Sequence, residues 1–179
     1  DAMGSGGARL PRFGLGKSGH SHPHRWPGGG LGLSRHLLAW PEAAARARRR
    51  CQRGSDRLFA EAGLISGDSN AGNWGQRENG EFVLFDWERF STGHPAIDLA
   101  PLIKGMGTPE EYRHLAARYC RFNPRSKNDL TRDIALAKAW IVSEVITLLH
   151  KRQKADFPRF QHWYRSYLPD WLKQIETVI

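Results

Sequence analysis

The sequence predicts an α+β fold that is mostly helical and carries one β-hairpin. Asn79-Gly80 lies between two segments with strand character, and this dipeptide is typical of a two-residue hairpin turn because both residues accept positive φ. Apolar residues recur at helical spacing over residues 128–152, which predicts a long helix with a basic C-terminal end. Thr108, Pro109 and Glu111 form the capping box that starts another helix. The length of 179 residues suits one domain with a real core.

The basic character of the chain belongs to its first third. The formal net charge is +9, to which residues 1–60 contribute +8 and residues 61–179 contribute +1. We therefore divide the chain into a basic leader rich in Gly, Pro and Arg (residues 1–57) and a C-terminal lobe (residues 58–179). Within the leader, residues 1–5 resemble a cloning remnant, and a linker and a helix interrupted by Pro41 follow. Such a leader can contact nucleic acid or an acidic surface, although a solvated arm or helix is the simpler interpretation.

Composition excludes several classes of protein. No apolar run approaches the roughly 18–20 residues that span a bilayer, and no apolar segment in the first thirty residues marks a secretory signal. Cys51 and Cys120 alone make no disulfide framework, which predicts a reducing compartment. We expect a cytoplasmic protein without a membrane partner.

The elements of the C-terminal lobe follow in order. A short apolar strand at "LIS" leads into the loop "GDSNAGN", and the hairpin then returns along the apolar strand Phe82–Phe85. A compact apolar set lies in residues 95–106, and the capped helix and the long helix come next. The tail from Phe157 predicts two short helices divided near Pro169, because proline interrupts a helix. We expect the aromatic residues of this tail to pack in the core or between helices.

Four polar side chains fall within thirty-one residues at the points where these elements begin and end: Asp68, Asn73, Asp86 and Asp98. Because a hairpin brings its two ends together, Asn73 and Asp86 are expected to face one point. Amide and carboxylate oxygens suit a hard cation, and Mg²⁺ typically takes one or two protein ligands plus phosphate oxygens and water. Asp68 then lies close enough to accept a proton from a hydroxyl. This arrangement indicates phosphoryl transfer, in which positioning and charge neutralisation carry the reaction.

The spacing resembles the catalytic loop and metal aspartate of protein kinases. It is similar above all to the aminoglycoside phosphotransferase and choline kinase family, which reads HGDxxxxN, then ID(W/F)E, then GxPxxDLA. The corresponding segments are "SGD" with Asn73, "FDWE" (residues 85–88) and "GHPAIDLA" (residues 93–100). The motifs cover residues 64–104, and the helical tail matches in general architecture. The three motifs in this order are specific, whereas each alone is weak.

The resemblance implies a protein-kinase-like C-terminal lobe that uses ATP or GTP with Mg²⁺. It implies that Asp68 is the catalytic base or orients the acceptor hydroxyl, that Asn73 and Asp86 hold the metal, and that Asp98 braces the catalytic loop. Glu88 is either a contact for a cationic substrate or a surface carboxylate. Taken singly, Asp68 and Asn73 are also ordinary turn residues.

The chain departs from the family pattern at two points. Ser66 replaces the family's histidine before Gly-Asp. We expect the standard nucleotide lobe to be absent from this sequence, because only about sixty residues precede the loop, and Lys17 is their single lysine. Two functions therefore stay open: a phosphotransferase acting on an aminoglycoside-, choline- or sugar-like hydroxyl, or a catalytically silent lobe that serves as a binding module. A nucleic-acid-binding module on residues 1–57 has no recognised motif in its favour.

Overall fold

The computed structural model describes residues 42–60, 63–152 and 157–179. The helices are α2 (Glu42–Ala60), α3 (Ala96–Leu99), α4 (Pro109–Tyr119), α5 (Lys127–Arg152) and α6 (Phe157–Ile175). The strands are β1 (Leu64–Ile65), β2 (Trp74–Gln76), β3 (Phe82–Leu84) and β4 (Ser91–Thr92), and 3₁₀ turns occupy Ala71–Asn73, Trp87–Arg89 and Ala100–Leu102. The coarse prediction of a mostly helical α+β chain is confirmed. The predictions for the leader up to residue 41 lie outside the described residues.

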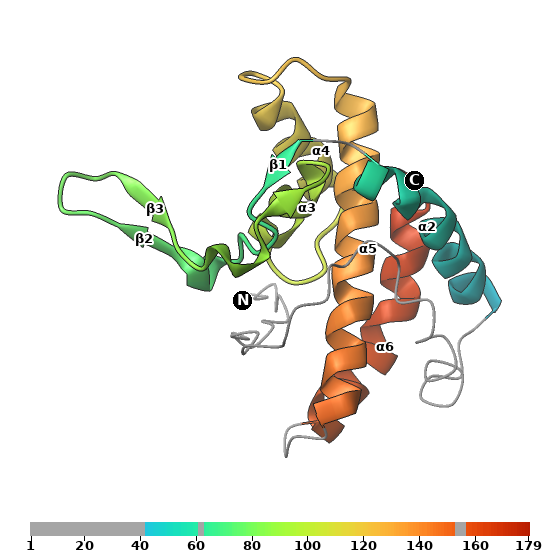
Figure 1. The fold of residues 1–179 in the computed structure, drawn as a ribbon. Helices are drawn as coiled ribbons and strands as arrows, with labels where there is room; N and C mark the ends of the chain where they lie inside the picture. Colours follow the sequence, from blue (N-terminus) through green and yellow to red (C-terminus); the bar gives the residue numbers. More distant parts are fainter. Residues whose placement is uncertain (1–41, 61–62, 153–156) are drawn as a thin grey trace, which may run out of the picture.

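Helix α5 is the axis of the molecule. It lies between α2, α3 and α4, and α6 packs beside it (Figure 1). From Leu130 to Trp140 every residue except Arg132 is buried, so this half of the helix is enclosed on all faces. The predicted helix over 128–152 is confirmed, but its first half is not amphipathic, because neighbours cover every side of it.

Helix α2 crosses the boundary that we placed between residues 57 and 58. It packs against both α5 and α6. Cys51 and Leu58 are fully buried in the shared core. The described end of the leader thus belongs to the same helical body as the residues that follow it.

Helix α4 begins as its sequence predicts. The Thr108 side chain accepts a hydrogen bond from the Glu111 backbone N–H, and the Glu111 carboxylate accepts one from the Thr108 N–H. Pro109 occupies the first helical position, where its missing N–H costs nothing. The capping box is confirmed.

Helix α6 corrects the predicted break at Pro169. The helix continues from Phe157 to Ile175 with Pro169 inside it. Packing overrides the lost hydrogen bond, because Leu168, Trp171 and Leu172 on either side of the proline are all buried. The aromatic residues Phe160, Tyr164 and Trp171 are buried as expected, whereas Tyr167 is exposed.

Two small antiparallel sheets carry the loop region. Strand β1 pairs with β4, with Leu64 opposite Thr92 and Ile65 opposite Ser91. Strand β2 pairs with β3, with Trp74 opposite Leu84 and Gln76 opposite Phe82. The β2–β3 hairpin extends away from the helical body (Figure 1).

The hairpin is confirmed, but its turn is not the two-residue turn predicted from Asn79-Gly80. The Gly80 N–H donates to the Arg77 carbonyl, and the Arg77 N–H donates to the Glu81 carbonyl, which encloses a three-residue loop. Gly80 has φ of 86°, while Asn79 does not adopt positive φ. A type I turn followed by a left-handed glycine gives this pattern, and it leaves Asn79 free to accept from the Glu81 N–H through Oδ1.

The apolar strand of the hairpin is not a buried strand. Phe82 is 71% exposed and Phe85 is 55% exposed.

Within the described ranges, no helix has the length and apolar character that crossing a membrane requires.

Candidate active site

The loop that begins at Ser66 is held in place by hydrogen bonds to Asp98 on α3. One carboxylate oxygen of Asp98 accepts from the Ser66 N–H at 2.7 Å, and the other accepts from the Gly67 N–H at 2.9 Å. The Ser66 hydroxyl donates to the same carboxylate at 2.9 Å. Asp98 therefore braces the loop through three hydrogen bonds. Ser66, which departs from the family pattern, donates two of them, one from its backbone N–H and one from its hydroxyl, and is buried.

Asp68 is half-buried in this loop, and its carboxylate has a defined orientation. The Asn70 side-chain amide donates to Asp68 Oδ1 at 2.7 Å. This bond restricts the rotation of the carboxylate and leaves Oδ2 as the second acceptor. Asn70 Oδ1 in turn accepts from the Gly72 N–H at 2.8 Å, so the orienting amide is itself held.

Asn73 closes the loop and joins it to the hairpin. Its Nδ2 donates to the Asp68 carbonyl oxygen at 2.8 Å, and its own carbonyl accepts from the Phe85 N–H at 2.7 Å. Asn73 therefore bonds both to Asp68, the candidate base, and to Phe85, the residue immediately before Asp86. Because Nδ2 is engaged with protein, Oδ1 is the side-chain atom available to a cation.

Asp86 has an unusual backbone. Its φ is 60° and its ψ is 66°, and it is the single non-glycine residue with positive φ among those that the structure describes. The following residue secures the turn, since Trp87 Nε1 donates to the Leu84 carbonyl at 2.8 Å. Left-handed conformations of non-glycine residues cost on the order of 1–3 kcal/mol and cluster at functional sites. The strand thus ends in a strained residue whose exposed carboxylate has no hydrogen bond or ion pair within the described residues.

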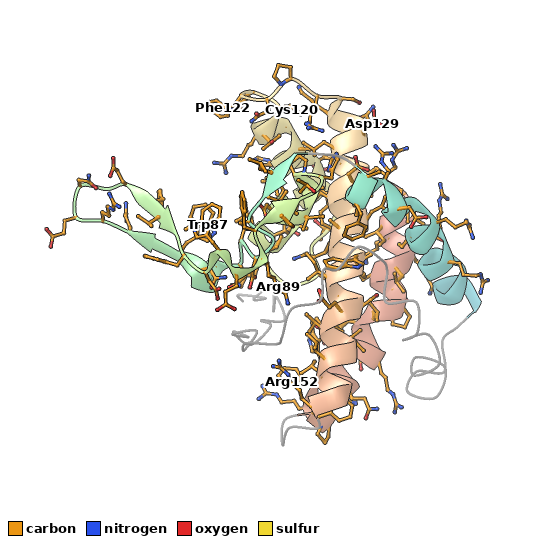
Figure 2. All side chains as sticks on the ribbon, viewed as in Figure 1. Trp87, Arg89, Cys120, Phe122, Asp129 and Arg152 are labelled. Carbon is orange, nitrogen blue, oxygen red and sulfur yellow. The ribbon has the colours of Figure 1, made fainter. Side chains whose placement is uncertain are left out.

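Arg89 and Glu144 belong to the site but were not predicted from the sequence. Gly67 has φ of 75°, and a Cβ there would lie 2.5 Å from the Arg89 carbonyl oxygen. The backbone of Arg89 therefore packs directly on the loop. Its guanidinium Nη1 lies 3.8 Å from Oε1 of Glu144 on α5. Figure 2 shows Arg89 at the base of the hairpin on the side toward α5.

The charge of Asp68 affects the pKa of the Glu144 carboxyl. Burial raises the pKa of the Glu144 carboxyl above its usual value, the Arg89 guanidinium opposes the rise, and the charge of Asp68 adds to it. The two carboxylates thus lie within electrostatic reach of each other. The signal in the sequence was a lone acid in the apolar run "AWIVSEVITLL", but nothing local indicates which loop that acid faces.

The donor set fits a cation that needs few protein ligands. Asn73 Oδ1 and the Asp86 carboxylate are both hard oxygen donors, and Mg²⁺ commonly binds through one or two such groups and completes its shell with phosphate and water. Across the described part of the chain, no group of three or more His, Cys, Asp or Glu side chains forms a candidate metal cluster. Glu88, the other candidate contact, is exposed on the 3₁₀ turn after Asp86.

Comparison with protein-family models, with curated proteins and with solved structures finds no match to this chain.

Proposed function

We propose that the chain is the catalytic lobe of an ATP- or GTP-dependent, Mg²⁺-dependent phosphotransferase that acts on a hydroxyl group of a small molecule. The observation that carries this proposal is Asp86, an exposed carboxylate held in a left-handed conformation where the hairpin returns to the loop of Asp68 and Asn73. The order and spacing of the motifs, which resemble those of the aminoglycoside phosphotransferase and choline kinase family, support a protein-kinase-like lobe. An aminoglycoside-, choline- or sugar-like acceptor follows from the same resemblance.

In phosphoryl transfer the protein contributes mainly by positioning the reactants and neutralising charge. The acceptor hydroxyl oxygen forms a bond to the terminal phosphorus, and the bond from that phosphorus to the leaving nucleoside diphosphate breaks. Asp68 orients the hydroxyl and takes its proton on Oδ2, while the amide of Asn70 holds Oδ1. Asp98 keeps the loop backbone in place during the reaction.

Asn73 and Asp86 are the residues that would hold the metal. Bound Mg²⁺ neutralises charge on the phosphate oxygens. The protein restrains each of the two residues, because the Asn73 amide is anchored to the Asp68 carbonyl and the Asp86 backbone is held by its turn.

The exposed apolar side chains around the same residues favour a second candidate function. Between residues 64 and 90 six large apolar residues are exposed: Leu64, Trp74, Phe82, Phe85, Trp87 and Phe90. Exposed apolar surface of this kind marks interaction sites. A catalytically silent lobe that serves as a binding module would present the same surface without using Asp68.

Thermal unfolding with and without Mg²⁺–ATP tests the proposal. A ligand at a hundred times its Kd stabilises the native state by about 2.7 kcal/mol. We expect the full chain to show a magnesium-dependent rise in Tm, and Asp86→Ala to lose it. Asp170→Ala, an exposed aspartate on α6, is the matched control and keeps the shift.

The outcomes separate the two candidate functions. An equal shift in Asp86→Ala and the unaltered chain would remove Asp86 from the metal site. No shift in any of the three proteins would contradict nucleotide binding by this chain and favour the silent binding module.

A further inference from the structure

Two polar side chains are buried in the helical body behind the candidate catalytic loop. His94, which follows β4, is 5% exposed, and Asp133 on α5 is 1% exposed. Nε2 of His94 lies 3.3 Å from Oδ2 of Asp133. Buried polar groups of this kind are costly unless they are paired, so the position of each depends on the other.

The hydrogen bonds of His94 determine the position of its proton. Its Nδ1 accepts from the Ala96 backbone N–H at 3.1 Å, so Nδ1 carries no hydrogen. The ring is then neutral with its proton on Nε2, and Nε2–H donates to Asp133. Arg125 Nη1 lies 3.4 Å from the same Nε2, and because both groups carry hydrogen in this tautomer, this approach is not a hydrogen bond.

Asp133 is held in turn by an arginine of α2. Arg57 of α2 donates to its Oδ2 at 2.9 Å. Arg132 Nε lies 4.0 Å from its Oδ1, which is too far for a hydrogen bond. The carboxylate therefore links α2, α5 and the segment after β4 at one buried point.

The same segment holds the candidate catalytic loop. The Gly93 N–H donates to the Gly63 carbonyl at 2.7 Å, and the His94 N–H donates to the Leu58 carbonyl at 2.9 Å. Ala96, whose N–H His94 accepts, is the first residue of α3, and Asp98 lies two residues further on. The Asp98 carboxylate then holds Ser66 and Gly67, the two residues before Asp68.

We infer that His94 is a positioning residue for the loop of Asp68. Its contact with Asp133 fixes the start of α3, and α3 in turn holds Asp98 against the loop; we call this chain of contacts the relay. The His94 imidazole accepts from Ala96 on one side and donates to Asp133 on the other, so it joins α3 to α5. The consequence for catalysis rests on the proposed phosphotransferase function, whereas the relay itself does not need nucleotide and is tested without it.

Nitrogen-15 NMR of the unaltered chain reports the tautomer of His94. We expect a neutral ring with hydrogen on Nε2 and none on Nδ1 at pH 7. A ring with hydrogen on Nδ1, or on both nitrogens, would overturn the relay, because Nδ1 could then not accept from Ala96.

Amide hydrogen exchange measures how firmly Asp98 holds the backbone N–H groups of Ser66 and Gly67. Asp133→Asn removes the charge at the end of the relay, and Asp129→Asn makes the same change one turn earlier on α5, at an exposed pair with Arg132. We expect Asp133→Asn to speed exchange at the Ser66 and Gly67 amides by about tenfold, the size expected for a weakened hydrogen bond. Asp129→Asn leaves both amides unchanged.

Amides of α6, such as that of Leu172, serve as the internal reference for general destabilisation. Unchanged exchange at Ser66 and Gly67 would overturn the inference, and so would an acceleration equal to that of the reference amides. If Asp133→Asn does not fold, His94→Asn replaces it, since its Oδ1 keeps the bond to Ala96 but cannot reach Asp133. Loop exchange in His94→Asn at the level of the unaltered chain would show that capping of α3 alone is sufficient, which contradicts the relay.

Titration with Mg²⁺–ATP keeps the two proposals distinguishable. We expect Asp133→Asn to bind nucleotide several-fold more weakly than Asp129→Asn does. If the unaltered chain binds no nucleotide, the proposed function fails, and the exchange rates and the tautomer still decide the relay.

Discussion

At the scale of single residues, the backbone of Asp86 gives the most informative signal. A left-handed aspartate persists only where surrounding structure determines it, and here the Leu84–Trp87 hydrogen bond closes the turn. The strain and the exposed carboxylate lie at the same residue. A site that places a ligand group in this way is expected to be less stable than a relaxed turn.

We predict that Asp86→Gly is more stable than Asp86→Ala by about 1 kcal/mol, because glycine adopts positive φ without steric cost. Both variants lose the carboxylate, so the comparison isolates the backbone. Urea unfolding of the two variants measures the difference. Equal midpoints would mean that residue 86 relaxes to negative φ once the aspartate is gone.

Lys138 is a buried ammonium group whose pKa is lowered by its surroundings. It is 5% exposed, and its Nζ donates to the Ile103 carbonyl at 2.7 Å. Burial lowers the pKa of this ammonium to about 8, and the charge of Glu111 opposes the shift. Because the folded pKa is depressed, the unfolded chain binds more protons between about pH 8 and the ordinary lysine value.

The contribution of Lys138 to stability therefore rises with pH across this range. We predict that the unaltered chain gains about 2–3 kcal/mol of stability relative to Lys138→Met between pH 7 and pH 10, as the buried ammonium loses its proton. The difference between the two proteins is the quantity to measure, since buried Cys51 and Tyr164, whose pKa values rise to about 12, oppose the trend equally in both. A difference that is constant with pH would show that Lys138 does not titrate in this range.

At the scale of elements, helix ends are determined by a few local groups. The box at Thr108 satisfies two backbone N–H groups at the start of α4, which packs on α5. Tyr112 of the same helix is fully buried, and its hydroxyl donates to the Met106 carbonyl. The cap therefore orients a helix that covers α5 near Lys138.

We predict that Thr108→Ala lowers the free energy of unfolding by about 1 kcal/mol, the usual cost of losing such a cap. Thr177→Ala, which removes an exposed hydroxyl bonded to Gln174 near the chain end, is the control and is expected to stay within about 0.5 kcal/mol. Thermal or urea unfolding of both variants decides the matter. A loss in both of equal size would assign the effect to threonine itself and not to the cap.

At the scale of the whole molecule, the chain divides into a helical body and an extended hairpin. The buried residues form one cluster around α5, whereas strands β2 and β3 pair mainly with each other (Figure 1). A two-stranded hairpin has little stability of its own. Arg77 at its turn is exposed.

We predict that trypsin cuts after Arg77 before it cuts within α5, and that the nicked chain keeps the thermal transition of the helical body. The physical reason is that the turn opens locally without disturbing the core. Mass spectrometry of a limited digest and calorimetry of its product test both parts. A large fall in Tm on nicking would show that the hairpin supports the body.

The sequence by itself determined the features that depend on neighbours a few residues apart. The cap at Thr108, the extent of α5 and the existence of the hairpin were correctly predicted because turns, caps and helical periodicity are local interactions. The spacing of Asp68, Asn73, Asp86 and Asp98 places four polar groups near the ends of short elements, whereas their roles in catalysis stay a prediction.

Only the tertiary structure decided the rest, because those features depend on residues that are distant in sequence. Pro169 stays within α6 since buried side chains on both sides hold the helix against the core. Glu144 reaches Arg89, and Asp133 reaches His94, across separations of more than thirty residues. The left-handed backbone of Asp86 is equally invisible in the sequence, since aspartate adopts such a conformation only where its surroundings impose it.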